Sequence, residues 1–495
     1  MSVDEKRLID EKTAAFVVIG GGIAGVTCAE TLSALSPEKK VILITASPLI
    51  KAVTNFQQLS KALETFDVVE KPSSSLQSEC SNVEIIHASV TALDSGKHIV
   101  ETDAGKTVKY DKLCICTGGK PKLICKDNPY VIGIRDTESV QAFQKKLSGS
   151  RRIVVVGNGG IATELVYEVQ GCEVVWAIKD DSISTMYLDA GAAQFILPKL
   201  KEGKPQQSGL LKRLKYTVAD SPSPGVQSTP GGALGPDWAE KVTLKGGSQG
   251  DQPRVHVEYK VEVKEVWTAE EFNARNPGQS ESSSSGNHEE WPVCVELTNG
   301  VVYGCDLVVS ATGVYPNTHP FVKDNQFRLG ADGGLEVNSK MQTSVQDVFA
   351  AGDVCTAGWQ PSPLWQQMRL WSQARQMGAY SAKCMLADLH QEDIHMDFCF
   401  ELFAHVTKFF NYKVILLGKY NAHGLGKDYH VLLRMTEGKE YVKTVMHDGK
   451  MVGATLIGET DLEETFENLI LNQMDLSSFG EDLLYPGVDI QDFFD

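Results

Sequence analysis

The feature that most constrains this chain is a pattern that occurs twice: an apolar strand, a glycine-rich turn and the start of a helix. The first turn is Gly20-Gly21-Gly22-Ile23-Ala24-Gly25, and the second is Gly157-Asn158-Gly159-Gly160-Ile161-Ala162. A second apolar run follows each turn, at residues 41–45 and 174–178, which completes a βαβ unit of about 30 residues. In such turns glycines permit the tight bend and let the backbone approach a diphosphate, which rests on free N–H groups at the helix start. The sequence therefore predicts two dinucleotide-binding halves.

Further strands that end on glycine tie the two halves together. An apolar run ending on Thr117-Gly118 follows the first βαβ unit, and a similar run ending on Thr312-Gly313 follows the second. A third run ends on Gly352-Asp353, which delivers an acid to the strand end where open α/β sheets bind ligands. We therefore expect an α/β fold with two Rossmann-like domains, the second inserted in the first. Strand-rich composition from residue 397 and an amphipathic helix at residues 462–474 predict an α+β C-terminal domain.

The bulk properties exclude several other classes of protein. The 495-residue chain has a net charge of −17, which argues against direct nucleic-acid binding because that needs concentrated Lys and Arg. It contains no run of about 18 apolar residues, so no membrane span is expected. The charged start, residues 1–13, resembles neither a signal nor a transit peptide, and the 11 cysteines form no disulfide framework. We expect a protein of the cytoplasm and nucleus with reduced thiols, and we assign no metal site.

In this order and spacing, the five glycine-containing motifs resemble those of the flavin-dependent pyridine nucleotide-disulfide oxidoreductase family. The likeness covers the chain apart from an insertion at about residues 200–291. It implies a glutathione-reductase-like arrangement with FAD in the first half, NADH or NADPH in the second and a C-terminal interface-type domain. The implied boundaries are residues 1–135 and 316–395 for the FAD domain, 136–315 for the NAD(P) domain and 396–495 for the C-terminal domain.

The resemblance assigns residues of the first half to FAD. The first turn would hold the diphosphate, a strand would meet the adenine by its backbone, and two further turns would complete the site. These residues are Gly20, Gly21, Gly22, Ile23, Ala24, Gly25, Val90, Thr117, Gly118, Gly352 and Asp353. An alternative for Asp353 is the N-cap of the next helix. The family usually binds the adenosine ribose with an acid after the second strand; here Ser47 takes that place, and a hydroxyl binds more weakly.

The same likeness assigns NAD(P)H to the second half, through Gly157, Asn158, Gly159, Ile161 and Gly313. The acid that selects the ribose 2′-hydroxyl of NADH is again missing, and Ile178-Lys179 stands in its place. Lys179 is either a ligand for the 2′-phosphate of NADPH or a solvated surface lysine. The preference between the two coenzymes therefore stays open.

Glu164 and a lysine are the predicted catalytic residues. Glu164 matches a family glutamate that faces the flavin and pairs with a lysine near N5, and such a lysine steadies the charge of the reduced ring. Lys51 is the candidate partner and Lys61 the alternative. Either lysine could equally be a solvated one.

The redox cysteines of the family are missing. Its disulfide reductases place two cysteines beside the flavin at C-x-x-x-x-C or C-x-x-C spacing, and no such pair exists here. Cys114 and Cys116 lie on one face of a predicted strand, where burial is favoured over redox work. Cys355 is the one cysteine to test for flavin proximity. We interpret His405 as structural, because Phe410 stands where a partner glutamate would be.

Together these features predict an FAD-dependent oxidoreductase that takes hydride from NAD(P)H. Its electrons would pass to oxygen or another acceptor rather than to a disulfide. The alternative is an NAD(P)H-sensing flavoprotein that binds and protects an oxidation-sensitive protein, and the resemblance suggests a tRNA ligase. A third hypothesis, a ferredoxin- or quinone-type reductase, predicts faster turnover with those acceptors than with oxygen.

Local patterns add expectations for single elements. Residues beyond Thr54, up to about residue 67, have helical character, and a helix is predicted at about residues 364–386. The insertion is predicted to hold loops at residues 221–235, 246–252 and 280–286 around a half-exposed strand at 254–263. We interpret the insertion as a tolerated surface excursion rather than a binding module. Asp448-Gly449 suits a type I′ hairpin turn.

Overall fold

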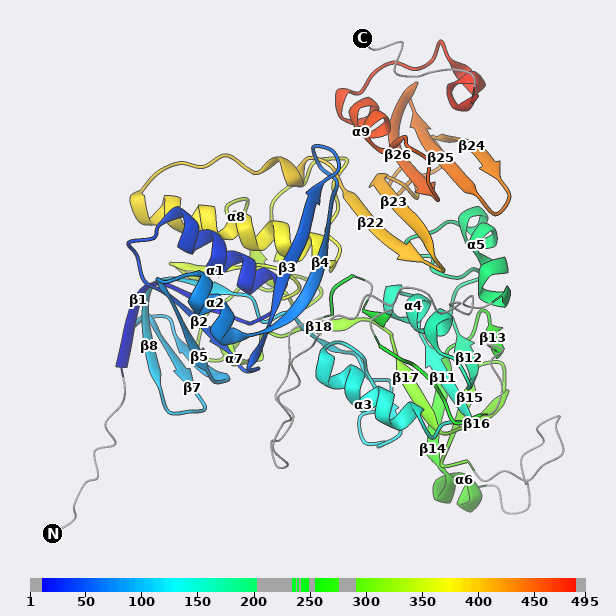
Figure 1. Cartoon of the computed structure of the whole chain (residues 1–495), viewed down its shortest axis with the longest axis horizontal. Helices are drawn as coiled ribbons and strands as arrows, with labels where there is room; N and C mark the ends of the chain where they lie inside the picture. Colours follow the sequence, from blue (N-terminus) through cyan, green and yellow to red (C-terminus); the bar gives the residue numbers. More distant parts are fainter. Residues whose placement is uncertain are drawn as a thin grey trace.

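The three largest sheets of the fold are two that are rich in parallel strands and one that is antiparallel (Figure 1). It is described from a computed structural model for residues 11–202, 234–236, 238–239, 242–248, 254–275 and 291–486. The predicted α/β class, with one Rossmann-like half inserted in the other, is confirmed. Strand β20 (Val348–Ala350), which follows the second half in sequence, returns to pair with β8 (Thr107–Ile115) of the first. None of the helices in these residues has the length and apolar character needed to cross a membrane.

The first half surrounds a seven-stranded sheet in the order β5-β2-β1-β8-β7-β6, with β20 also on β8. Its central strands are parallel and apolar, because crossover helices cover the sheet and leave little of it to solvent. Helices α1 and α8 pack together so closely that a Cβ on Gly378 would lie 2.3 Å from the Ala24 carbonyl oxygen (Figure 1). The bounds in this half are β1 Glu11–Ile19, α1 Ile23–Leu35, β2 Val41–Thr45, α2 Ser73–Glu79, β5 Val83–His87, β6 Val90–Asp94, β7 Ile99–Thr102, α7 His319–Val322, β19 Leu335–Val337, β21 Cys355–Ala357 and α8 Trp371–His390.

A long hairpin leaves the first half. Its strands, β3 (Leu49–Gln58) and β4 (Glu64–Pro72), pair antiparallel, so the predicted helical character beyond Thr54 is wrong. Strand propensity depends on the partner that a segment finds, and here β4 supplies it. The tip enters the C-terminal domain, where Ala62 is buried and its backbone N–H donates to Glu467 at 3.1 Å. The hairpin therefore joins two domains.

The second half has a parallel sheet in the order β10-β17-β11-β12-β13, with an antiparallel sheet of β14, β15 and β16 against it. Strand β13 comes from the insertion and extends this sheet, with Val255 opposite Val174 of β12. The insertion is therefore partly built into the domain, and its interpretation as a surface excursion is wrong for this strand. The predicted loops lie largely outside the described residues. The bounds are β10 Val131–Ile132, α3 Thr137–Leu147, β11 Arg152–Val156, α4 Gly160–Glu168, β12 Glu173–Ala177, α5 Ala190–Glu202, β13 Arg254–Glu258, β14 Val263–Thr268, α6 Ala269–Arg275, β15 Val293–Leu297, β16 Val302–Cys305 and β17 Leu307–Ser310.

Two short elements mark the passage between the halves. Strands β9 (Gly119–Pro121) and β18 (Val314–Pro316) pair antiparallel where the chain crosses from one half to the other. Helix α3 begins directly after Asp136, whose carboxylate accepts a hydrogen bond from the Ser139 backbone at 2.8 Å. This cap fixes where the second half starts after the crossing.

The C-terminal domain is an antiparallel sheet in the order β22-β23-β26-β25-β24, covered by α9. The predicted hairpin turn at Asp448-Gly449 joins β25 to β26, and both residues have positive φ. The helix predicted at about residues 364–386 is α8, which begins only at Trp371. The Gln373 side chain bonds the backbone of Met368 and Gln366, each at 2.8 Å, which holds that stretch extended. The bounds are η2 Phe398–Phe400, β22 Ala404–Phe409, β23 Tyr412–Gly418, β24 His430–Thr436, β25 Glu440–His447, β26 Lys450–Ile457, α9 Glu463–Asn472 and η3 Gly480–Leu484.

Candidate active site

A cavity of about 1480 Å³ lies between the two halves. Both glycine turns line it, together with the strand ends at Ala311–Gly313 and Gly352–Asp353. The carboxyl ends of parallel strands are where open α/β sheets bind ligands. The cavity is large enough for more than one drug-sized ligand, since single-ligand pockets measure roughly 300–1,000 Å³.

The first turn forms a cradle that side chains cannot enter. Gly20 has a φ of +124°, and a Cβ there would lie 2.2 Å from the Cys116 carbonyl oxygen. A Cβ on Gly25 would lie 2.0 Å from the Gly20 carbonyl oxygen. Helix α1 starts after Gly22, and no side chain caps its first N–H groups. These groups and the helix dipole therefore point into the cavity, which fits the diphosphate of FAD.

The second turn repeats this geometry. Gly157 has a φ of +126°, and a Cβ there would lie 2.2 Å from the Ala311 carbonyl oxygen. Gly159 is extended and has open space beside it, and no side chain caps the helix α4 that follows. The turn therefore fits a second diphosphate, that of NAD(P)H.

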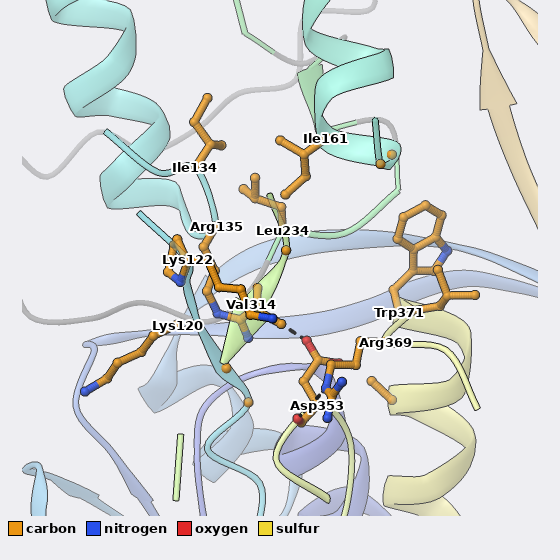
Figure 2. Close-up of a pocket in the computed structure, with 18 of the residues that line it drawn as sticks. Lys120, Lys122, Ile134, Arg135, Ile161, Leu234, Val314, Asp353, Arg369 and Trp371 are labelled. Carbon is orange, nitrogen blue, oxygen red and sulfur yellow. Dashed lines mark hydrogen bonds and ion pairs between the residues drawn. The ribbon is translucent and has the colours of Figure 1, made fainter. Parts of the chain in front are cut away.

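Two arginines that the sequence did not reveal flank Asp353 (Figure 2). Arg135 Nη1 lies 3.4 Å from the Asp353 carboxylate, and Arg369 Nε donates to the Asp353 carbonyl at 2.9 Å. A Cβ on Gly118 would lie 2.5 Å from Arg135 Nη2, so this side chain crosses the first half's Thr-Gly turn. Strand β21, not a helix, follows Asp353, so the N-cap alternative is wrong. The sequence signal that could have pointed to this site is Arg135 itself, a cation between the short strand β10 and the N-cap Asp136.

The predicted pair of Lys51 and Glu164 is not formed. Lys51 is buried, and its ammonium contacts the Glu70 carboxylate at 2.6 Å and the Thr137 hydroxyl at 2.7 Å. This placement follows from the unpredicted hairpin, because β3 carries Lys51 opposite Glu70 of β4. Glu164 does line the cavity, where it accepts a hydrogen bond from Trp238. The alternative, Lys61, is exposed at the hairpin tip.

Three other residues assigned to FAD have different surroundings. Ser47 is buried and does not line the cavity; its hydroxyl accepts a hydrogen bond from the Leu49 backbone at 3.2 Å. Its neighbours Thr45 and Ala46 line the cavity instead, and the role of Ser47 at the ribose stays a prediction. Val90 lines the cavity at the start of β6. Thr117 also lines it, and its hydroxyl donates to the Asn317 carbonyl at 2.8 Å, which ties the two crossing strands.

In the second half Asn158, Lys179 and Asp180 lie together on the cavity wall. The Asn158 amide donates to the Asp180 carboxylate at 2.7 Å and accepts from the Ser184 backbone at 2.5 Å. Asp180, which sequence reasoning missed, is the acid nearest the end of β12. Lys179 is exposed. Asn158 therefore locks the turn to the segment after β12.

The cysteines and His405 have structural surroundings. Among the described residues Cys116 is the only cysteine that lines the cavity, and it is 5% exposed. Its sulfur lies 3.5 Å from that of Cys114, which is fully buried. Cys355 is also buried outside the cavity lining, and burial raises the pKa of its thiol. His405 is not part of the cavity lining but is buried behind Trp371, which is, and desolvation lowers the pKa of its imidazole to about 3.

Comparison with known proteins shows the family to which the chain belongs. The family described as pyridine nucleotide-disulphide oxidoreductase matches residues 14–203 and 264–378. The chain belongs to the pyridine nucleotide-disulphide oxidoreductase family. It is 57% identical over 490 residues to pyridine nucleotide-disulfide oxidoreductase domain-containing protein 1 of Mus musculus, covering 97% of this chain and 98% of that one. The protein of that name from Drosophila melanogaster is 43% identical over 488 residues, with 97% and 99% covered.

A solved structure supports the same fold. The water-forming NADH oxidase of Lactobacillus brevis bound to NADH superposes with a TM-score of 0.63 at 15% identity, covering 94% of this chain and 91% of that one. As a member of the pyridine nucleotide-disulphide oxidoreductase family, the protein is an NAD(P)H-dependent flavin oxidoreductase that uses FAD and NAD(P)H. The two uncapped helix starts fit these cofactors, as do the glycines at which a Cβ would clash with the backbone.

Proposed function

We propose that the protein carries electrons from NAD(P)H to oxygen or another small acceptor, and not to a disulfide. The observation that carries this proposal is the cavity lining: Cys116 is its only cysteine among the described residues, and it is almost fully buried. No cysteine pair in the whole chain has the spacing of a redox dithiol. With oxygen the balanced reaction is NAD(P)H + H⁺ + O₂ giving NAD(P)⁺ and H₂O₂.

The chain's own contribution is alignment. Bound FAD would supply an acceptor for the hydride of the nicotinamide and would release two electrons afterwards. The turn at Gly20 would hold one diphosphate on the first half, and the turn at Gly157 would hold the other on the second. When two reactants are held in one cavity, the translational and rotational entropy that a collision in solution would cost is lost on binding, which lowers the barrier of the chemical step. Neither step requires a thiol.

Anaerobic titration tests the proposal. NADH or NADPH should bleach the visible flavin band of the purified protein, and air should restore it while hydrogen peroxide accumulates. Addition of oxidised glutathione or a protein disulfide should leave the reoxidation rate unchanged. A flavin band that neither coenzyme bleaches would refute the proposal, and reoxidation that depends on a disulfide would refute its acceptor.

The exposed edge of the C-terminal sheet favours a second candidate, an NAD(P)H-sensing flavoprotein that binds another protein. Strand β24 is the last in its sheet, and Val431, Leu433 and Met435 on one of its faces are 43%, 53% and 55% exposed. Apolar side chains on an open edge are typical of surfaces that pair with another chain. The tRNA ligase as partner and the location in cytoplasm and nucleus remain predictions.

This second candidate has its own measurement. Binding to a purified tRNA ligase should depend on NAD(P)H and should weaken at least tenfold in Leu433→Lys, since each 1.4 kcal/mol lost is about tenfold in affinity. Thr436→Lys is the control, because Thr436 is exposed on the opposite face of the same strand. Equal binding of the two variants would exclude this surface.

A further inference from the structure

A short piece of the insertion crosses the cavity between the two halves. We call it the strap, residues 234–236 and 238–239. The Leu234 backbone N–H donates to the Arg135 carbonyl at 2.8 Å, at the crossing between the halves. Gly235 lies on β4 of the first half, where a Cβ would come within 2.4 Å of Val68 Cβ. Figure 2 shows Leu234 in the cavity between Ile134 and Ile161. The strap therefore touches the crossing and the first half before it reaches the second.

Trp238 is the strap's contact with the second half. The residue is 6% exposed and lines the cavity, and its indole Nε1–H donates to the carboxylate of Glu164 on α4. An indole N–H can only donate, so a buried tryptophan needs an acceptor, and a carboxylate is a strong one. The next strap residue, Ala239, is buried in the core of the second half. The donor is therefore held at a fixed place.

We propose that Trp238 is a positioning residue that fixes the Glu164 carboxylate in the chamber where the two nucleotides meet. The lysine expected for this task is committed elsewhere, since Lys51 contacts Glu70 and Thr137. The insertion thereby completes the site of hydride transfer, because it supplies a side chain that orients a cavity-lining acid. The inference deepens the proposed function and rests on it, because it takes the cavity to be the place where NAD(P)H reduces FAD.

The test compares Trp238→Phe, Glu164→Gln and the double variant. Each single variant loses one hydrogen bond to a charged group. We expect each to slow anaerobic bleaching of the flavin by NAD(P)H about tenfold, which corresponds to about 1.4 kcal/mol. If Trp238 acts through Glu164, adding Trp238→Phe to Glu164→Gln should change the rate less than twofold further. Trp267→Phe, on β14 outside the cavity lining, is the control and should match the wild type. Independent effects of the two substitutions, or a wild-type rate in Trp238→Phe, would overturn the proposal.

Equilibrium measurements separate this inference from the proposed function. Trp238 fluorescence, taken as the difference between wild type and Trp238→Phe, should change in Glu164→Gln and on titration with NAD⁺, with no turnover needed. If the wild-type flavin is not bleached by NAD(P)H, the proposed function fails while these fluorescence changes still decide the contact. If Trp238→Phe does not fold, the emission of the wild type and Glu164→Gln still decides it, and identical spectra refute the proposal.

Discussion

Gly159→Ala should separate coenzyme binding from folding. Gly159 precedes α4 with φ −93° and ψ −177°, an extended conformation that any residue adopts, and no atom lies within 4 Å of where its Cβ would be. The folded protein therefore has room for the methyl group. The same space is where a diphosphate would approach the free N–H groups of the helix. The substitution should therefore weaken binding of the coenzyme without lowering the stability of the folded protein.

The two effects differ in size and sign. Replacing glycine in a compatible conformation stabilises a protein by about 0.4–1 kcal/mol, because the unfolded chain loses freedom. Displacing the diphosphate by one methyl group loses a hydrogen bond to a charged group, about 1.5–3 kcal/mol, which raises the Kd roughly 10- to 150-fold. Gly157→Ala is the contrasting variant: its Cβ would lie 2.2 Å from a carbonyl oxygen at a φ of +126°, and such strain costs about 1–3 kcal/mol of folding free energy.

Three measurements decide the matter: urea unfolding, the Kd for NAD⁺ by calorimetry and the visible absorbance of bound FAD. Gly159→Ala should unfold at the wild-type urea concentration or above, bind NAD⁺ at least tenfold more weakly and keep its FAD, which the first half holds. Gly157→Ala should lose stability as well as affinity. Wild-type NAD⁺ affinity in Gly159→Ala would refute the assignment of the second turn, and loss of FAD in that variant would refute the separation of the two sites.

Two further predictions concern charge. His405 stays neutral in the folded protein because burial lowers its pKa to about 3, whereas the unfolded chain takes up a proton near its ordinary value of 6.5. Its contribution to stability is therefore complete well above pH 6.5, and about 1.4 kcal/mol of it is lost by pH 5.5; urea unfolding of His405→Gln should lack this loss, and an unchanged pH dependence would contradict the sign. For Lys179→Glu, the Kd for NADPH should rise about tenfold more than that for NADH if the ammonium meets a 2′-phosphate, and equal changes would place Lys179 away from it.

The glycine turns could be predicted because their demand is local. A φ near +125° and a carbonyl oxygen within 2.2 Å leave glycine as the residue that fits, so the constraint is visible in the sequence at Gly20 and Gly157. The nested halves followed from the order of such turns. The partner of Lys51 could not be predicted in this way. It depends on a hairpin whose strand pairing is a tertiary contact, and the same residues have helical character when taken alone.

The insertion shows a second limit. Its sequence interrupts a repeating pattern, so a surface excursion is the natural interpretation, yet it supplies β13 to the sheet and Trp238 to the cavity. Neither contribution has a local sequence signature. The pattern of a half-exposed strand does not indicate which strand it pairs with, and a single tryptophan does not indicate which acceptor its indole N–H finds. Only the approach of the strap to α4 connects Trp238 with Glu164.

The first half offers more to the diphosphate of FAD than to its adenosine ribose. The hydroxyls at and just after the end of β2 make local bonds, since Thr45 donates to the Ser47 carbonyl at 3.1 Å and Ser47 accepts from Leu49. Beside the start of α1, by contrast, the Arg135 guanidinium lies 3.4 Å from the Asp353 carboxylate, and that of Arg369 donates to the Asp353 backbone carbonyl. Arg369 is itself paired with the Asp332 carboxylate at 2.6 Å, so the two guanidinium groups and the two carboxylates balance in charge. The attraction for a diphosphate therefore comes from the uncapped start of α1. The missing ribose acid therefore does not argue against FAD, because the free N–H groups at the start of α1 do not depend on it.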